Sequence, residues 1–408
     1  MYENKDVEER VILFAVRQHN EDDTESSLVE LAELARTAGA YVVGNLIQNL
    51  SRPNPATYIG SGKVEELRDM IWEEEATGVI CDDELKPSQM KNLTDELDTK
   101  VMDRTLLILD IFAGRAATSE GKLQVELAQL QYSLTRLTGF GQSMSRLAGG
   151  IGTRGPGERK LEIDRRVIRD RVAQLDKELQ EVARHRDVTR AQRMKNHTPV
   201  AAIVGYTNAG KSTLLNTLTD AGVLEEDELF ATLDPTTRML ELSNDQQVLL
   251  TDTVGFIRKL PHHLVDAFKS TLEEAKYADL IIHVVDVSNS QWQAQMEVVY
   301  RTLHELGVEN KKVITLFNKC DLLTEDDVFY DPHADRTLRI SAKTGEGLNE
   351  FLAVLEVMLR EDKVLLKQTF SYDRAGEIQR IRKYGELIKE EYRDDGIYVE
   401  AYVPENLL

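Results

Sequence analysis

The chain has 408 residues, too many for one ordinary hydrophobic core, so we expect two or three domains. Its composition, 41% hydrophobic and 30% charged with only two cysteines, excludes wholesale disorder, a disulfide framework and a multi-cysteine zinc site. The formal net charge of −21 argues against a nucleic-acid partner for the chain as a whole.

The first residues, MYENKDVEER, lack the basic and apolar stretches of a secretory signal. No apolar run approaches the roughly 18 residues that a membrane span needs. We therefore expect a cytoplasmic protein without a membrane span, and we expect a monomer.

Short apolar runs alternate with helical patterns in the first segment, residues 1–117. Val11–Val16, Tyr41–Ile47 and Gly78–Cys81 read as strands, whereas Val64–Glu75 and Ser88–Leu97 read as helices. Strands that alternate with helices predict a parallel sheet, so this segment is expected to be an N-terminal α/β domain.

Residues 118–196 have a different periodicity. Leu123, Leu127, Leu130, Leu134 and Leu137 are spaced four and three residues apart. The same spacing recurs over Ile168, Val172, Leu175, Leu179 and Val182. This is the period of a coiled-coil seam. Between the two stretches lie many glycines, which cannot continue a helix. The pattern predicts an antiparallel helical hairpin with a glycine-rich tip.

The same region carries most of the excess positive charge. Residues 136–195 hold 15 basic and 8 acidic side chains, a net charge of +7 inside an acidic protein. Arginines bind phosphates in bidentate fashion, and glycines allow close approach to a ligand. The tip is therefore a candidate RNA probe, although a passive linker with solvated helix faces is the alternative. The expected RNA-binding residues are Arg136, Arg146, Gly149, Gly150, Arg154, Arg159, Lys160, Arg165 and Arg166.

A phosphate-binding loop follows in residues 197–361. The apolar run Pro199–Val204 leads directly into Gly205-Tyr-Thr-Asn-Ala-Gly-Lys-Ser212 and then into a helical pattern. This is G-x-x-x-x-G-K-S in its strand–loop–helix context. Lys211 is expected to reach the β- and γ-phosphates, and the Ser212 hydroxyl to bind Mg²⁺.

Three further motifs end predicted strands in the expected order. Asp252-Thr-Val-Gly255 supplies a carboxylate for a magnesium-bound water and a backbone N–H for the γ-phosphate. Asn318-Lys-Cys-Asp321 ends in a carboxylate that can accept two hydrogen bonds from guanine. Ser341-Ala-Lys343 offers backbone donors to the guanine oxygen. The conjunction predicts a P-loop GTPase domain that binds GTP and GDP.

The predicted catalytic residues are Lys211, Asn208 and Gly255. Phe230–Arg238 resembles a first switch, in which Thr232, Thr236 or Thr237 completes the magnesium shell; Thr232 is our choice alongside Ser212. The expected nucleotide-binding residues are Gly205, Tyr206, Thr207, Asn208, Ala209, Gly210, Lys211, Ser212, Thr213, Phe230, Ala231, Thr232, Leu233, Asp234, Asp252, Thr253, Val254, Gly255, Asn318, Lys319, Cys320, Asp321, Ser341, Ala342 and Lys343.

Phe256 occupies the place where Ras-like enzymes carry the glutamine that orients the attacking water. We therefore expect slow intrinsic hydrolysis. Asn208 matches the asparagine that binds K⁺ in potassium-activated GTPases, so we expect K⁺, or a partner that reorders the switches, to complete the site.

Residues 362–408 are expected to form a small α/β domain. A strand pattern over Leu365–Ser371 and a helix over Ala375–Arg382 precede a hairpin that turns at Asp394-Asp-Gly396.

The chain resembles the HflX family of ribosome-associated GTPases, within the translation-factor-related class of P-loop GTPases. The resemblance rests on Pro55–Lys63, Asp103–Phe112, Glu120–Leu130 and, most specifically, Gly149–Glu158, together with the G-domain motifs. It implies binding to the large ribosomal subunit, its rRNA and proteins, in the GTP form. It also implies that stalled or idle ribosomes are split, notably under stress, and that hydrolysis drives release.

Two alternatives remain open at this point. The family has been credited with a second nucleotide site, and Gly60-Ser-Gly-Lys63 superficially suggests one, although it lacks the first glycine and the full spacing. An RNA-remodelling enzyme with an ATP site in the N-terminal domain is therefore one alternative. A regulatory switch that acts on a protein partner is the other.

Overall fold

The computed structural model describes residues 8–18, 23–144, 156–195, 198–219, 229–230, 233–242, 246–260, 274–323, 328–361 and 363–404. It confirms the predicted multidomain α/β class. Its contacts divide the chain into two compact units. The first comprises Met1–Glu181, Glu228–Phe230 and Lys259–Phe268, and the second Val182–Asp227, Ala231–Arg258 and Lys269–Leu408. The division into four segments stays a prediction.

A four-stranded parallel sheet forms the centre of the first unit, with the strand order β2-β1-β3-β4. Its strands are β1 (Arg10–Arg17), β2 (Tyr41–Asn49), β3 (Gly78–Cys81) and β4 (Lys100–Asp103). The helices that connect and cover them are α1 (Thr24–Thr37), α2 (Ser61–Glu73), α3 (Pro87–Leu97) and α4 (Arg104–Arg115). Ile12 and Phe14 point to a core shared with Leu67 of α2 and Leu93 of α3. The predicted strand–helix alternation is confirmed.

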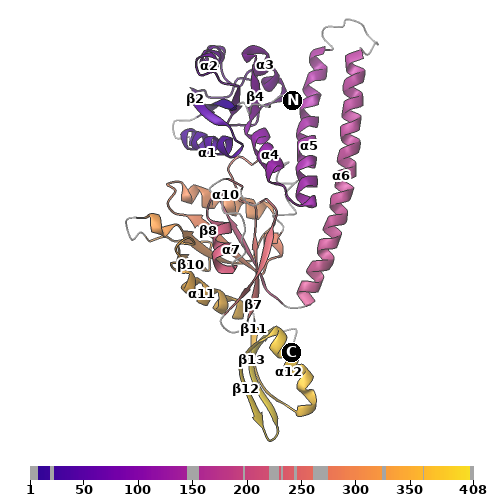
Figure 1. Cartoon of the computed structure of the whole chain (residues 1–408), viewed down its shortest axis with the longest axis vertical. Coiled ribbons are helices and arrows are strands. Elements are labelled where there is room, and N and C mark those ends of the chain that lie inside the picture. Colours follow the sequence, from indigo (N-terminus) through magenta and orange to yellow (C-terminus); the bar gives the residue numbers. More distant parts are fainter. Residues whose placement is uncertain are drawn as a thin grey trace, which may run out of the picture. The chain divides into compact units, whose positions relative to one another are not determined.

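The hairpin helices α5 (Ser119–Met144) and α6 (Pro156–Lys195) run side by side in opposite directions (Figure 1). Leu127 and Leu175, which belong to the two predicted seams, are buried. Arg171 of α6 donates hydrogen bonds of 2.7 and 2.9 Å to the two carboxylate oxygens of Glu126 on α5. The helical hairpin is thereby confirmed, whereas its tip lies outside the described residues.

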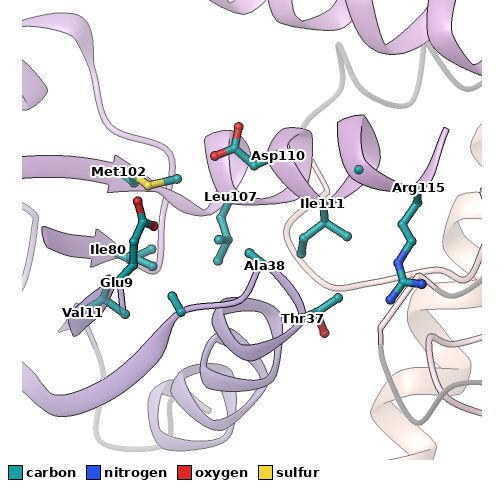
Figure 2. Close-up of a pocket in the computed structure, with 12 residues that line it drawn as sticks. Glu9, Val11, Thr37, Ala38, Ile80, Met102, Leu107, Asp110, Ile111 and Arg115 are labelled. Carbon is teal, nitrogen blue, oxygen red and sulfur yellow. The ribbon is translucent and has the colours of Figure 1, made fainter. Parts of the chain in front are cut away.

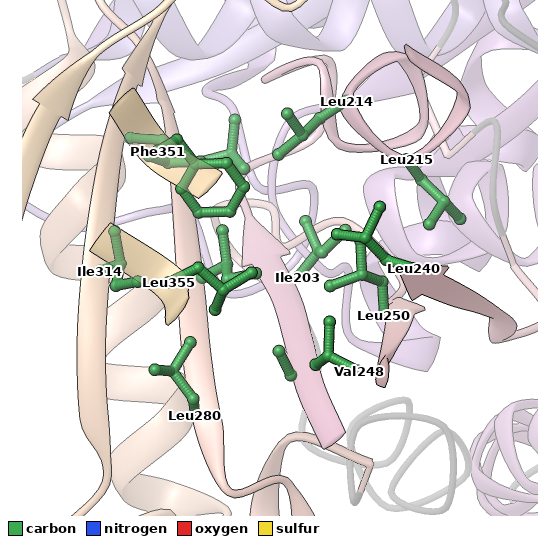
Figure 3. Packing of buried hydrophobic residues seen from close by; sticks show 14 of the residues in the cluster. Ile203, Leu214, Leu215, Leu240, Val248, Leu250, Leu280, Ile314, Phe351 and Leu355 are labelled. Carbon is green, nitrogen blue, oxygen red and sulfur yellow. The ribbon is translucent and has the colours of Figure 1, made fainter. Parts of the chain in front are cut away.

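The second unit contains a six-stranded sheet with the order β10-β9-β8-β5-β7-β6, parallel except for β6. Its elements are β5 (Val200–Gly205), α7 (Lys211–Thr219), β6 (Thr236–Glu241), β7 (Gln247–Asp252), β8 (Leu280–Asp286), α10 (Trp292–Glu305), β9 (Lys312–Asn318), the 3₁₀ helix Cys320–Leu322, β10 (Arg336–Arg339) and α11 (Leu348–Arg360). Ile203, Leu214 and Phe351 belong to one buried cluster that ties α7 and α11 to the sheet (Figure 3).

A three-stranded antiparallel sheet of order β11-β13-β12 closes the second unit. It consists of β11 (Lys363–Phe370), the 3₁₀ helix Tyr372–Arg374, α12 (Ala375–Tyr384), β12 (Glu386–Arg393) and β13 (Gly396–Pro404). The hairpin turns where predicted, because Gly396 has a positive φ of 145° and a Cβ there would lie 2.3 Å from the Phe370 carbonyl oxygen. Among the described residues, no helix has the length and apolar character needed to cross a membrane.

Candidate functional site: a nucleotide pocket at the carboxyl ends of the strands

The phosphate-binding loop lies where β5 ends and α7 begins. β5 pairs with β7 on one side and β8 on the other, so this is where the order of parallel strands reverses. Ligands of open α/β sheets bind outside the carboxyl ends of the strands at such a point. The motifs at Asp252 and Asn318 end β7 and β9 of the same sheet. The structure therefore brings the predicted nucleotide motifs to one edge.

The loop needs its second glycine. Gly210 has a φ of 93°, and a Cβ there would lie 2.3 Å from the Asn318 side-chain nitrogen. Only glycine fits this conformation at this distance. Helix α7 begins at the next residue, so its N-terminal N–H groups and positive dipole end face the loop.

Lys211 is the buried cation of the loop. Its ammonium group donates a 2.8 Å hydrogen bond to the Tyr206 carbonyl oxygen. Burial lowers the pKa of Lys211 to about 8; nearby Lys319 adds to this effect and Asp252 opposes it. A buried ammonium that is short of negative charge is suited to bind a phosphate.

Oxygen ligands for Mg²⁺ are present at the start of α7. The Ser212 hydroxyl donates a 2.8 Å hydrogen bond to a carboxylate oxygen of Asp252, so the two predicted magnesium-associated groups are adjacent. Mg²⁺ prefers oxygen ligands and commonly takes only one or two from the protein, with water and substrate phosphates as the rest. The pair fits this ion. Thr232, the other predicted ligand, lies outside the described residues.

Asn318 joins three loops of the site. Its side-chain N–H donates to the Ala209 carbonyl oxygen at 2.8 Å, and its side-chain oxygen accepts from the Ala342 N–H at 2.9 Å. The phosphate loop, the Asn318–Asp321 motif and the Ser341–Lys343 motif are thus held together by one buried amide. The Asp321 side chain is exposed, so its carboxylate is accessible to a nucleotide base.

The sequence did not predict an ion pair that lies beside the Asn318–Asp321 motif. The Lys319 ammonium lies 2.7 Å from a carboxylate oxygen of Asp286, the last residue of β8. The sequence did hold a signal for this residue, because Asp286 is a carboxylate at the end of an apolar strand of the same parallel sheet. It was missed because it belongs to no motif.

Gly255 packs directly against the phosphate loop. A Cβ at Gly255 would lie 2.9 Å from both the Cα and the Cγ2 methyl of Thr207, and 3.0 Å from the Lys211 ammonium nitrogen. The next residue, Phe256, is 2% exposed, and its backbone bonds to the loop: its N–H donates to Gly205 and its carbonyl accepts from Thr207, at 3.1 and 2.8 Å. Phe256 therefore has no polar group free to orient water.

Phe230, which was expected in the first switch, packs within the first unit. It belongs to the first compact unit, is 3% exposed, and its ring centroid is 4.7 Å from that of Phe112. Its expected nucleotide contact stays a prediction. Leu233 is buried and Asp234 half-buried, whereas Ala231 lies outside the described residues.

Two residues of the first unit, which flank nucleotide motifs in the sequence, have an unusual backbone conformation. Phe230 and Lys259 both have positive φ, 58° and 54°. The Lys259 ammonium lies 2.5 Å from Asp82 and 2.6 Å from Asp83, which follow β3. No sequence signal marked these partners, because they are far apart in the chain.

The basic residues of the hairpin divide into two groups. Arg136 is committed to the fold: its guanidinium lies 2.7 Å from the buried carboxylate of Asp103, and its side chain is 11% exposed. Arg165 is half-buried and donates to the Leu137 carbonyl oxygen at 2.8 Å, whereas Arg166 is exposed. Arg136 was expected to bind RNA, and its burial in an ion pair corrects that expectation.

The other expected RNA-binding residues cannot be assigned to either group. Arg146, Gly149, Gly150 and Arg154 lie outside the described residues, and for Arg159 and Lys160 only the helical backbone is described.

A cavity of about 320 Å³ lies in the first unit between α1, α4 and the sheet (Figure 2). Its lining includes Ile80 and Met102 from the strands and Asp110 from α4, but no residue of Gly60-Ser-Gly-Lys63. In that string Gly60 N–H donates to the Gln48 side chain at 2.7 Å, and the Lys63 ammonium lies 2.7 Å from Glu66. The string thus begins an ordinary helix and does not open onto this cavity.

The sequence matches three family descriptions in succession. These are GTP-binding GTPase N-terminal over residues 25–113, GTP-binding GTPase Middle Region over residues 115–193, and 50S ribosome-binding GTPase over residues 200–319. Together they span both the N-terminal region and most of the nucleotide site.

Curated relatives match along nearly the whole chain. A protein named GTPase HflX from Lacrimispora saccharolytica is 63% identical, with 100% of this chain and 96% of the relative covered. One of the same name from Caldanaerobacter subterraneus is 51% identical, over 97% of this chain and 91% of the relative. A solved complex of SsGBP with GDP is 27% identical, with a TM-score of 0.49, and covers 86% of this chain and 99% of that one. The chain belongs to the HflX family of GTPases, and the reaction it catalyses is the hydrolysis of GTP.

Proposed function

We propose that this GTPase binds the large ribosomal subunit in its GTP form, splits stalled or idle ribosomes, and is released by hydrolysis. The observation that carries the proposal is the match of residues 200–319 to a 50S ribosome-binding GTPase. The hairpin is the proposed RNA contact, because its residues 136–195 carry a net charge of +7 in a protein of −21. Phosphate contacts of this kind give affinity that falls steeply with salt.

The shape of the hairpin supports this role. Helix α6 has 40 residues, which corresponds to a length of about 60 Å. Arg166 and Arg169 are exposed on its first half, towards the glycine-rich tip. A long helical arm can carry such cations into a groove of structured RNA that a compact domain cannot enter.

Hydrolysis is proposed to need help from outside the chain. The position of the water-orienting glutamine is taken by Phe256, whose side chain is apolar and buried. Asn208 has a left-handed backbone with a φ of 59° and an exposed side chain, so its amide oxygen is accessible to a cation. We propose K⁺ as that cation. Exchange of K⁺ for Na⁺ should slow hydrolysis, and equal rates in both salts would refute the role of K⁺.

A sucrose-gradient profile tests the ribosomal function. Ribosomes are mixed with the protein and a non-hydrolysable GTP analogue at two salt concentrations. We expect co-sedimentation with the large subunit, conversion of whole ribosomes into subunits, and weaker binding at the higher salt. Whole ribosomes that stay intact, with protein bound equally with and without nucleotide, would contradict the proposal.

A variant of the hairpin separates RNA contact from nucleotide binding. Replacement of Arg154, Arg159 and Arg166 by alanine should weaken subunit binding about tenfold or more and reduce its salt dependence. GTP affinity should stay unchanged. Arg184→Ala, an exposed arginine on the distal part of α6, is the matched control. If the protein bound a protein partner instead, the triple variant would leave subunit binding intact.

A further inference from the structure

Thr207 carries a buried hydroxyl group that the nucleotide motifs do not explain. It is the third residue of the phosphate loop, where backbone N–H groups are expected to bind phosphate, and its side chain has no assigned role. Thr207 is 6% exposed, and within the described part of the chain its hydroxyl oxygen is buried without a hydrogen-bond partner. A buried hydroxyl left unpaired is costly, so such groups in folded proteins usually serve a ligand or a water.

The surroundings of Thr207 indicate which ligand. Its Cγ2 methyl and the Lys211 ammonium both approach Gly255, within 2.9 and 3.0 Å of the position a Cβ would take. Lys211 and the Gly255 N–H are the two groups expected to bind the γ-phosphate. The Thr207 hydroxyl shares its Cβ with that methyl group, so it lies next to the place where the γ-phosphate contacts converge.

The backbone holds Thr207 in this position. Its N–H donates a 2.8 Å hydrogen bond to the Phe256 carbonyl oxygen, and the Phe256 N–H donates to the Gly205 carbonyl oxygen at 3.1 Å. These two bonds form a short parallel bridge between the phosphate loop and the segment after Gly255. A hydroxyl carried on a backbone that is fixed in this way needs little reorganisation to meet a developing charge.

We propose that the Thr207 hydroxyl donates a hydrogen bond to a γ-phosphate oxygen of GTP. This hydrogen bond becomes stronger as negative charge develops on that oxygen during hydrolysis, so Thr207 is a catalytic residue. In the step, a water oxygen attacks the γ-phosphorus and the bond from that phosphorus to the bridging oxygen breaks. The bridging oxygen leaves on GDP, and the water proton passes to the phosphate product. Thr207 keeps its own proton. The role does not depend on the ribosome.

Three variants test the hydroxyl. Thr207→Val removes it while preserving shape, Thr207→Ser retains it, and Thr207→Ala removes both hydroxyl and methyl. Single-turnover hydrolysis without ribosomes, and the affinities for GDP and for a non-hydrolysable GTP analogue, are measured for each. We expect Thr207→Val to slow hydrolysis about 10- to 100-fold, the range for a lost hydrogen bond to a charged group. It should also weaken the analogue relative to GDP, and Thr207→Ser should stay close to the native protein.

Thr302→Val is the matched control. Thr302 lies on α10, and its hydroxyl donates a 2.9 Å hydrogen bond to the Val298 carbonyl oxygen within the same helix. Its removal should leave hydrolysis within twofold of the native rate. Native hydrolysis and native analogue-to-GDP preference in Thr207→Val would overturn the proposal. If Thr207→Val does not fold, equal rates for Thr207→Ser and Thr207→Ala overturn it in the same way.

Discussion

The nucleotide site and the helical hairpin use charge in opposite ways. At the nucleotide site the Lys211 cation is buried and bonded to the Tyr206 carbonyl oxygen, and the Asn318 amide holds three loops together. On the hairpin, Arg166 is exposed on a helix. Short motifs identify the first kind of site because the conformation demands particular residues at fixed spacing. The second kind depends on a total charge, which many arrangements satisfy.

Arg136 shows that a count of charges in the hairpin does not give the number of cations exposed to RNA. By charge count it belongs with the hairpin, yet its guanidinium pairs with the fully buried Asp103 and stacks 3.3 Å from the centre of the Tyr132 ring. Net charge therefore overstates the cations available to RNA. The residues that matter are those whose side chains reach solvent.

The largest expected effect comes from Arg136→Met. The substitution keeps a long apolar stem but leaves the Asp103 carboxylate without its cation. Loss of one partner of a buried pair typically costs about 3 kcal/mol. The measurement is urea unfolding followed by hydrogen exchange of α4 and α5, which reports on the first unit.

Arg166→Met is the control for that loss. Because Arg166 is exposed, its removal should change stability by less than about 0.5 kcal/mol and should weaken ribosome binding instead. If the two variants exchanged these effects, the division of the hairpin cations would be wrong.

Asp321→Asn has the next largest expected effect. The exposed carboxylate is expected to accept two hydrogen bonds from guanine, and an amide presents one donor in place of an acceptor. GTP affinity should fall about 100-fold, while affinity for xanthosine triphosphate, which offers the complementary acceptor, should rise. Competition binding with both nucleotides measures the shift. Unchanged preference for GTP would remove Asp321 from base recognition.

The sequence predicted the elements well where periodicity or a motif acts locally. The parallel sheet of the first unit, the hairpin and the Asp394-Asp-Gly396 turn all rest on patterns within one segment, and the structure confirms them. What it did not predict are partners distant in the chain. The pairing of Lys319 with Asp286, or of Phe230 with Phe112, depends on how strands and loops meet in space.

The smallest expected effect is a difference in pH dependence between nucleotide binding and binding to the ribosomal subunit. Burial holds the pKa of Lys211 at about 8, and a bound phosphate favours the charged form, so binding takes up a proton once the pH exceeds 8. Affinity for a GTP analogue should therefore be constant below pH 7 and fall by up to about tenfold per pH unit above 8. Arginines stay charged over this range, so subunit binding by preloaded protein should hardly change. A parallel decline of both activities would point to general unfolding, whereas a decline of nucleotide affinity alone would show that the buried ammonium, not net charge, controls the site.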